Sequence, residues 1–294
     1  MENMKNHIAA PDPHGPDLWL DDRNSDPAFV AYYERESVSA RTKDRFRVVR
    51  DKMLRLREEK AGKTNAPLSV LNVGCGAGTE CQIWAELGHS VTGIDISEPL
   101  VQLARKRGSE EGFDIRFDIG SALALPYAAN TFDVCLIPQL LEHVQDWQKC
   151  LQEGVRVLRP GGVLYLSTTN VVCPVQNEFD LPLYSWYPKF VKRRCEKLAV
   201  TTHREWVSHT AYPAVHWFTF WQLRDFLAKK DMTCFDRFDL AAGDPGSAMR
   251  RMAFAMIRLL PPLRVAAYLL VAGTIVAGVK ASDIGDDGRP VQRS

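Results

Sequence analysis

Short apolar runs alternate with amphipathic segments through the middle of the chain. Residues 68–73, 89–96, 113–119, 131–138 and 163–170 form the apolar runs, and 79–87, 99–108 and 147–158 repeat apolar residues at helical spacing. Strands and helices that alternate in this way are typical of an open α/β sheet whose parallel strands are joined by crossover helices. Two more runs, at 232–241 and 274–281, predict a sixth and a seventh strand.

The flanking segments follow other patterns and divide the chain. Residues 1–66 are expected to form an N-terminal arm and helical cap, because a helical pattern runs from Ala28 to Lys60. Residues 67–281 are expected to form the main domain, and 282–294 a loose polar tail. Within the main domain, the aromatic-rich stretch 171–217 breaks the alternation and predicts an insert that shapes a binding site. Residues 244–270 predict a second, apolar helical insert.

The run from Val265 to Val279 is the only segment apolar enough to raise the question of a membrane span. It is shorter than the roughly 20 residues that a span requires, and Gly273 interrupts it. We therefore expect a short helix, a turn and a buried strand. Peripheral contact of residues 247–270 with a membrane surface remains an alternative to plain helical packing.

Composition narrows the class of protein without naming it. Hydrophobic residues make up 46% of the chain, charged residues 25%, and the formal net charge is +1. These values are ordinary for a globular protein and give no indication of a nucleic-acid partner. The seven cysteines contain no CxxC pair, which favours reduced thiols and a cytoplasmic location. No His, Cys or carboxylate cluster has metal-ligand spacing, so no metal is expected.

The stretch LNVGCGAGTE, with Gly74, Gly76 and Gly78, is typical of a ligand-binding turn between a strand and a helix. Dinucleotide folds use the spacing G-x-G-x-x-G, whereas here Thr79 occupies the sixth position, which disfavours NAD and FAD. Asp95 ends the second strand about 20 residues later, where an acid can accept hydrogen bonds from a ribose diol. Ile96 would then line the adenine. A structural turn and a helix cap remain the alternatives.

Five motifs in order resemble the class I S-adenosylmethionine-dependent methyltransferases. They are VLNVGCGAG, VTGIDIS, ALALPYAANTFDVCLI, LLEHVQDW and RVLRPGGVLYLST. The resemblance runs from Leu68 to Thr169 and is strongest to the small-molecule branch that includes the ubiquinone-biosynthesis O-methyltransferases. It implies S-adenosylmethionine as the cofactor. It also implies a Rossmann-like sheet of seven strands, mostly parallel with an antiparallel last strand, and helices on both faces.

The resemblance also assigns candidate cofactor residues, two of which depart from the family pattern. Asn72 replaces the frequent acid before the glycines, and Ser121 replaces the acid that bonds the adenine amino group. The cofactor-binding set expected on these grounds is Asn72, Gly74, Cys75, Gly76, Gly78, Asp95, Ile96, Ser121, Ala122, Gln139 and Tyr33. Gln139 would meet the methionine part, Ala122 would offer its N–H to the adenine, and the Tyr33 helix would close over the site.

Two histidines are the candidates for general-base catalysis. His143 in LLEHV follows the fourth strand at the edge of the sheet where ligands bind, and His216 precedes the helix before the sixth strand. For each of them a structural role is the alternative. The chemistry expected is methyl transfer to a small molecule, at oxygen before carbon or nitrogen, on an apolar, aromatic or lipid-linked acceptor. A cofactor-binding partner protein without turnover is the alternative of another class. The sequence leaves the acceptor and the oligomeric state open.

Overall fold

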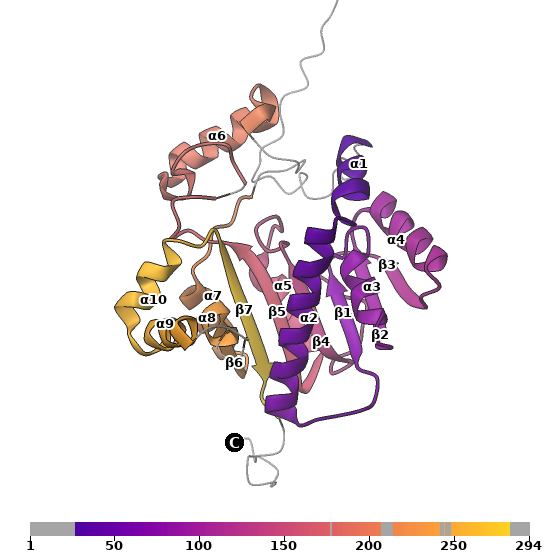
Figure 1. Ribbon diagram of the computed structural model, residues 1–294. Helices are drawn as coiled ribbons and strands as arrows, with labels where there is room; N and C mark the ends of the chain where they lie inside the picture. Colours follow the sequence, from indigo (N-terminus) through magenta and orange to yellow (C-terminus); the bar gives the residue numbers. More distant parts are fainter. Residues whose placement is uncertain (1–26, 177, 207–213, 242–243, 245–247, 283–294) are drawn as a thin grey trace, which may run out of the picture.

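The computed structural model describes residues 27–176, 178–206, 214–241, 244 and 248–282. A single sheet with the order β3-β2-β1-β4-β5-β7-β6 forms its centre (Figure 1). The strands are β1 (Ser69–Val73), β2 (Ser90–Asp95), β3 (Ile115–Ile119), β4 (Phe132–Pro138), β5 (Leu158–Thr169), β6 (Met232–Asp236) and β7 (Gly273–Lys280). The first five are parallel, and β7 pairs antiparallel with both β5 and β6. The predicted seven-stranded fold is confirmed.

Helices cover both faces of the sheet, as two separate buried clusters show. The main helices are α1 (Pro27–Glu36), α2 (Ala40–Ala61), α3 (Thr79–Ala85), α4 (Glu98–Glu110), α5 (Trp147–Val157), α6 (Lys189–Thr201), α7 (Phe220–Ala228), α8 (Arg237–Leu240), α9 (Ala248–Leu259) and α10 (Pro261–Tyr268). One cluster joins α2, α3 and α4 to the sheet, and the other joins α5, α7 and α10.

Strand β4 shows why the central strands of the sheet consist of continuous apolar runs. Val134 and Leu136 belong to the first cluster, whereas Cys135 and Ile137 belong to the second. Because successive side chains of a strand point to opposite faces, a strand covered on both faces needs a continuous apolar run. The segment FDVCLIP supplies one, and four of its residues are fully buried.

Two predicted elements differ from the structure for local reasons. The sixth strand was expected over 232–241 but ends at Asp236, because the Asp236 carboxylate caps α8 by accepting from the N–H groups of Phe238 and Asp239 at 2.8 and 2.9 Å. The fifth strand begins at Leu158, five residues before the expected start at Val163. Residues 159–162, which separate the predicted helix from the predicted strand, therefore lie within β5, where Gly161 has a φ of 76°.

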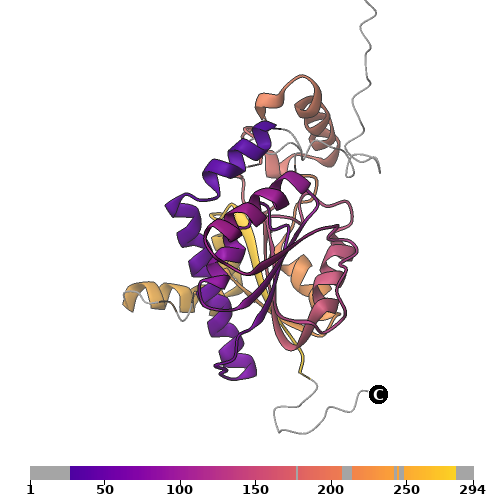
Figure 2. The ribbon, with the colours of Figure 1, turned by 90° about the vertical axis from the view of Figure 1, so that its right-hand side faces the viewer.

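The predicted irregular insert contains a helix. Between β5 and α7 the chain forms α6 and two short 3₁₀ turns, and the insert lies beyond the carboxyl edge of the sheet, opposite α1 (Figures 1 and 2). Its small core is formed by Phe179, Tyr184 and Ala199. The expected arm over 1–26, the tail over 283–294, and residues 177 and 207–213 of the insert lie outside the described residues. In the described part of the chain, no helix is long and apolar enough to cross a membrane.

Candidate functional site

The glycine loop leaves β1 with a backbone that side chains disfavour. Gly74, Gly76 and Gly78 have φ values of 74°, 50° and 79°. The N–H groups of Gly74 and Cys75 donate to the carbonyl of Ile94 at 2.8 and 3.1 Å, which ties the loop to β2. A Cβ on Gly78 would lie 2.8 Å from the Ala104 Cβ and 2.9 Å from the Phe117 ring. Both the conformation and the space therefore require glycine at this position.

Asp95 organises the loop and presents its carboxylate at the end of β2. One oxygen accepts from the N–H of Gly76 at 2.8 Å, and the other accepts from the N–H of Ser97 at 2.9 Å. Burial raises the pKa of this carboxyl, while the backbone hydrogen bonds oppose that rise. Because each carboxylate oxygen can accept two hydrogen bonds, Asp95 retains acceptor sites for a ribose diol.

Tyr33 closes over the same loop from the N-terminal helix α1. Its ring carbons lie 3.7 Å from where a Cβ of Gly76 would stand. Burial, and then the neighbouring Asp95 charge, raise the pKa of the Tyr33 phenol to about 12, so its hydroxyl stays protonated. The structure therefore brings together Tyr33, the glycines and Asp95, three parts of the predicted cofactor set.

The expected adenine side has an apolar rim at the ends of β2 and β3. Ile96 is 46% exposed and Ile119 is 45% exposed, so both apolar side chains are accessible at this edge. The Ser121 hydroxyl accepts from the N–H of Leu123 at 3.2 Å, and Ala122 packs against the neighbouring core. Sequence reasoning missed Ile119, although its place at the end of β3 matches that of Ile96 at the end of β2.

Asp118 does not supply the acid that is missing at Ser121. Its carboxylate accepts a hydrogen bond from the Tyr127 hydroxyl at 2.8 Å and pairs with Arg116 at the same distance. These contacts hold Asp118 on the strand, one residue before Ile119. Ser121 therefore stays the side chain predicted to bond the adenine.

Asn72 lies behind the loop and is 1% exposed. Its amide donates to the Oε2 of Glu80 at 3.0 Å, and burial raises the pKa of the Glu80 carboxyl to about 7. The Asn72 Oδ1 and the Glu80 Oε1 are buried, and neither has a hydrogen-bond partner. The carboxyl group absent from position 72 is therefore supplied by Glu80 in the first turn of α3. Sequence reasoning missed Glu80, because the pairing joins residues eight positions apart.

Gln139 and Glu142 shape the acceptor side, just after β4. Gln139 has a φ of 49° and donates through its side chain to the Ser167 hydroxyl at 3.1 Å. Glu142 is fully buried rather than solvated, accepts from the Thr168 hydroxyl at 2.6 Å, and has its pKa raised by burial to about 8. Its backbone carbonyl accepts from the N–H of Val215 at 2.9 Å, and so fixes the end of the insert.

Both histidine candidates lie at this edge. The Nε2 of His143 faces Glu178 of the insert, with 3.9 Å between the nitrogen and the carboxylate oxygen. Burial raises the pKa of Glu178. The N–H of His216 donates to the carbonyl of Glu142 at 3.3 Å, which brings the second candidate beside the first. Among the described residues, no three His, Cys, Asp or Glu side chains are grouped so that they could hold a metal ion.

The aromatic residues of the insert are divided between its core and its surface. Tyr184 is fully buried and stacks on Phe179 with 4.0 Å between ring centroids, so it belongs to the core. Trp186 is 53% exposed and Phe190 is 76% exposed. Only some of the predicted aromatic stripe is therefore available to line a binding site.

Comparison with known proteins agrees with this geometry. Residues 71–166 match a family model described as a methyltransferase domain. The ubiquinone biosynthesis O-methyltransferase of Chelativorans sp. (strain BNC1) is 34% identical over 114 residues, which cover 39% of this chain and 45% of that protein. The protein of the same name from Caulobacter vibrioides is 36% identical over 118 residues, covering 39% and 47%. The chain thus spans about half the length of the curated relatives it matches.

A solved structure extends the likeness of the fold beyond the matched domain. The plantazolicin methyltransferase BpumL, in complex with a desmethylPZN analog and SAH, superposes with a TM-score of 0.57 at 16% identity, covering 90% of this chain and 93% of that one. Residues 71–166 are therefore similar to a methyltransferase domain, and the sheet has the Rossmann-like fold found in that solved methyltransferase. The predicted family resemblance is confirmed.

Proposed function

We propose that this protein transfers a methyl group from S-adenosylmethionine to a hydroxyl of an apolar, aromatic or lipid-linked small molecule. The observation that carries the proposal is the convergence of three segments. Asp95 holds the glycine loop through the N–H of Gly76, Tyr33 covers that loop, and His143 lies at the carboxyl edge of the same sheet. A ribose site and a candidate base therefore share one edge.

The residues present fit this cofactor. The bare backbone of the glycine loop permits close approach, and Asp95 keeps acceptor sites for the ribose diol. Ile96 and Ile119 offer apolar walls to an adenine, with Ser121 and the N–H of Ala122 as its polar partners. Gln139 would meet the methionine part. When bound, S-adenosylmethionine supplies a methyl group on a positively charged sulfur, and the protein supplies alignment and exclusion of water.

His143 has the role of the general base: one of its ring nitrogens takes the proton from the hydroxyl of the substrate that receives the methyl group. Glu178 faces that ring across 3.9 Å and can orient it. The buried Glu142 would contribute indirectly, because its backbone fixes His216 and the end of the insert. His216 is the second candidate for the base.

Support for an apolar acceptor comes from the insert. Val175, Leu183, Trp186 and Phe190 expose apolar side chains from a segment that lies beyond the carboxyl edge (Figure 1). The O-methyltransferase names of the curated relatives support oxygen as the site of methylation. Transfer to carbon or nitrogen, and a cofactor-binding protein without turnover, are the other candidates.

The test is turnover of purified protein on a library of phenolic and lipid-linked acceptors, measured as S-adenosylhomocysteine release. We expect His143→Ala to lower kcat at least about 100-fold, the usual contribution of a general base. The same variant should leave the dissociation constant for S-adenosylhomocysteine unchanged. His203→Ala is the matched control, because His203 is exposed and stacks on Trp206 within the insert.

Three outcomes would count against this assignment. Full activity of His143→Ala would reject His143 as the base, and His216→Ala would then be measured in the same way. Equal losses in His143→Ala and His203→Ala would indicate damage to the insert. Binding of S-adenosylhomocysteine without turnover on any acceptor would favour the partner protein without activity.

A further inference from the structure

Helix α9 carries two apolar faces, and other described residues of the chain pack against only one of them. Phe254 and Ile257 lie against the core, where Phe254 contacts Phe238 at 6.4 Å between ring centroids. On the other side Met249, Met252, Met256 and Leu259 recur at spacings of three and four residues and are 75%, 62%, 46% and 78% exposed. Such spacing places them along one stripe of the helix.

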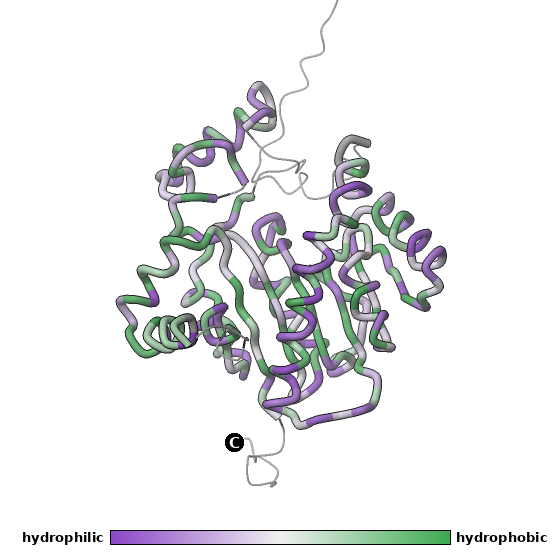
Figure 3. Tube along the Cα trace, viewed as in Figure 1, coloured by the Kyte–Doolittle hydropathy of each residue, from purple (hydrophilic) through white to green (hydrophobic). Residues whose placement is uncertain are grey.

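Apolar side chains are also exposed on and just after α10. Leu263 is 40% exposed and Leu270, just after the helix, is 85% exposed, while Tyr268 points inward and is fully buried. We call these exposed side chains, Met249, Met252, Met256, Leu259, Leu263 and Leu270, the outer apolar surface. Figure 3 shows apolar residues predominating along both helices, and Figure 2 shows α9 projecting from the body of the molecule. Large groups of exposed apolar side chains of this kind mark interaction sites.

Positive charge accompanies this surface. Residues 248–270 contain four arginines and no Asp or Glu. Helix α2, which lies on the side from which α9 projects (Figure 2), contains nine Lys or Arg and four Asp or Glu. The whole chain has a formal net charge of only +1, so positive charge is concentrated in these two segments.

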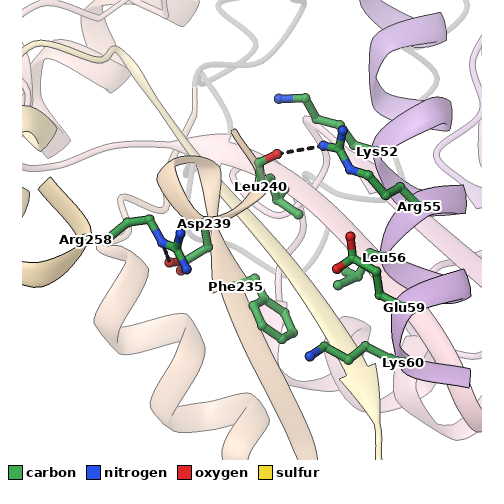
Figure 4. A pocket seen from close by; sticks show the side chains of 9 residues that line it. All are labelled: Lys52, Arg55, Leu56, Glu59, Lys60, Phe235, Asp239, Leu240 and Arg258. Carbon is green, nitrogen blue, oxygen red and sulfur yellow. Dashed lines mark hydrogen bonds and ion pairs between the residues drawn. The ribbon is translucent and has the colours of Figure 1, made fainter. Parts of the chain in front are cut away.

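The space between α9 and α2 shows how these charges are arranged. Lys52, Arg55 and Lys60 of α2 and Arg258 of α9 line a hollow of about 220 Å³ (Figure 4). Arg258 donates to Asp239 at 3.2 Å, and Asp239 also pairs with Arg264. Asp239 of α8 thus pairs with two of the four arginines, and Asp244 pairs with Lys52 and Arg55 at 2.8 and 3.1 Å. The positive excess therefore comes mainly from the other cations of α2.

We propose that the outer apolar surface docks onto an anionic lipid membrane, with the cations of α2 facing the headgroups. Helices of 12 and 8 residues cannot span a bilayer, but an amphipathic helix of that size can lie in its interface. Basic side chains beside such a helix add attraction to anionic lipids. A second copy of this chain fits less well, because residues 248–270 offer no acid to pair with the arginines of a copy.

The docked helices are fixed to the catalytic edge. The side-chain amide of Asn170, directly after β5, donates to the carbonyls of Tyr268 and Val271 at 2.9 and 2.7 Å. Docking of these helices would therefore fix the orientation of the end of β5 relative to the membrane surface. Delivery of a lipid-phase acceptor to that edge rests on the proposed function, whereas the docking itself does not.

The experiment is co-sedimentation of the full-length protein with vesicles of phosphatidylcholine, alone or mixed with phosphatidylglycerol. We expect binding to the mixed vesicles that weakens as salt is raised. Met252→Ser/Leu259→Ser removes two exposed apolar side chains without changing charge, and should lower the partition coefficient at least about tenfold. Val38→Ser/Leu87→Ser is the matched control, since these residues are 39% and 50% exposed and lie outside α2, α9 and α10, and it should bind like the wild type.

Four results would overturn the proposal. The first is no binding of the wild type to mixed vesicles. The second and third are equal losses of binding in the two double variants, and no loss in Met252→Ser/Leu259→Ser. The fourth is a shift from dimer to monomer in that variant by light scattering, which would assign the surface to a second copy. Calorimetry with S-adenosylhomocysteine runs in parallel. Because the outer apolar surface does not contact the glycine loop, intact cofactor binding with no vesicle binding would reject the docking and leave the proposed function standing.

Discussion

The cofactor side and the acceptor side of the sheet's carboxyl edge are built in different ways. On the cofactor side, three glycines and Asp95 make a site from backbone groups and one carboxylate, within 25 residues of sequence. On the acceptor side, Glu142, Glu178 and His216 come from segments far apart in the chain and meet through the insert. The constraints on the cofactor side are local and therefore appear in the sequence as a motif. The contacts on the acceptor side depend on tertiary packing and leave no such motif.

The largest effect should come from breaking the core of the insert. Tyr184→Ala removes a fully buried ring that stacks on Phe179, and such truncations cost about 4 kcal/mol. Because the insert has its own small core, we expect it to open while the sheet stays folded. Limited proteolysis should cut within 171–217, and S-adenosylhomocysteine should still bind in calorimetry. Global unfolding would show that the insert is not a separate unit.

Gly78→Ala tests the cofactor side, where a side chain is added to the glycine loop instead of being removed from a core. The φ of 79° and the 2.8 Å approach to Ala104 combine left-handed strain with overpacking, which together cost about 3 kcal/mol. The temperature of thermal unfolding should fall accordingly, and the affinity for the cofactor should fall with it. Gly112→Ala is the control, because its φ of 74° is similar but no atom lies within 4 Å of a Cβ, so about 1 kcal/mol is expected. Equal losses in both variants would remove packing from the explanation.

The smallest effect concerns the Asn72–Glu80 pair. Burial raises the pKa of Glu80 from 4.5 to about 7, so the folded protein holds a proton that the unfolded chain releases. The stability that this proton provides is present below pH 4.5 and is lost as pH rises through 7, by about 2 kcal/mol between pH 5 and pH 7. Glu80→Gln keeps a hydrogen-bond partner for Asn72 and removes the titration.

The free energies of unfolding of the two proteins at pH 5, 6 and 7 check this expectation. Glu80→Gln should gain on the wild type as pH rises. Parallel curves would mean that Glu80 is already ionised at pH 5. Asn72→Gln, which keeps the amide but lengthens the side chain, separates the loss of this contact from the loss of the proton.

Sequence alone predicted most of the fold, and it named those residues of the candidate site that lie in local motifs. The parallel strands were predictable because each must be apolar on both faces, as FDVCLIP is. The end of β6 was missed because Asp236 acts as a helix cap only once Arg237–Leu240 turn back on it. Glu80, Glu178 and Ile119 were missed for a related reason. The position of each relative to the site depends on residues that are distant in sequence and close in space. A pattern in a single sequence does not reveal which residues these are.

The central claim is that the glycine loop and Asp95 form an S-adenosylmethionine site. The most direct measurement is a calorimetric titration of the purified protein with S-adenosylhomocysteine and, separately, with NAD. The account predicts saturable binding of S-adenosylhomocysteine, no binding of NAD, and a loss of affinity of at least about tenfold, or 1.4 kcal/mol, in Asp95→Ala. Binding of NAD without binding of S-adenosylhomocysteine would contradict it.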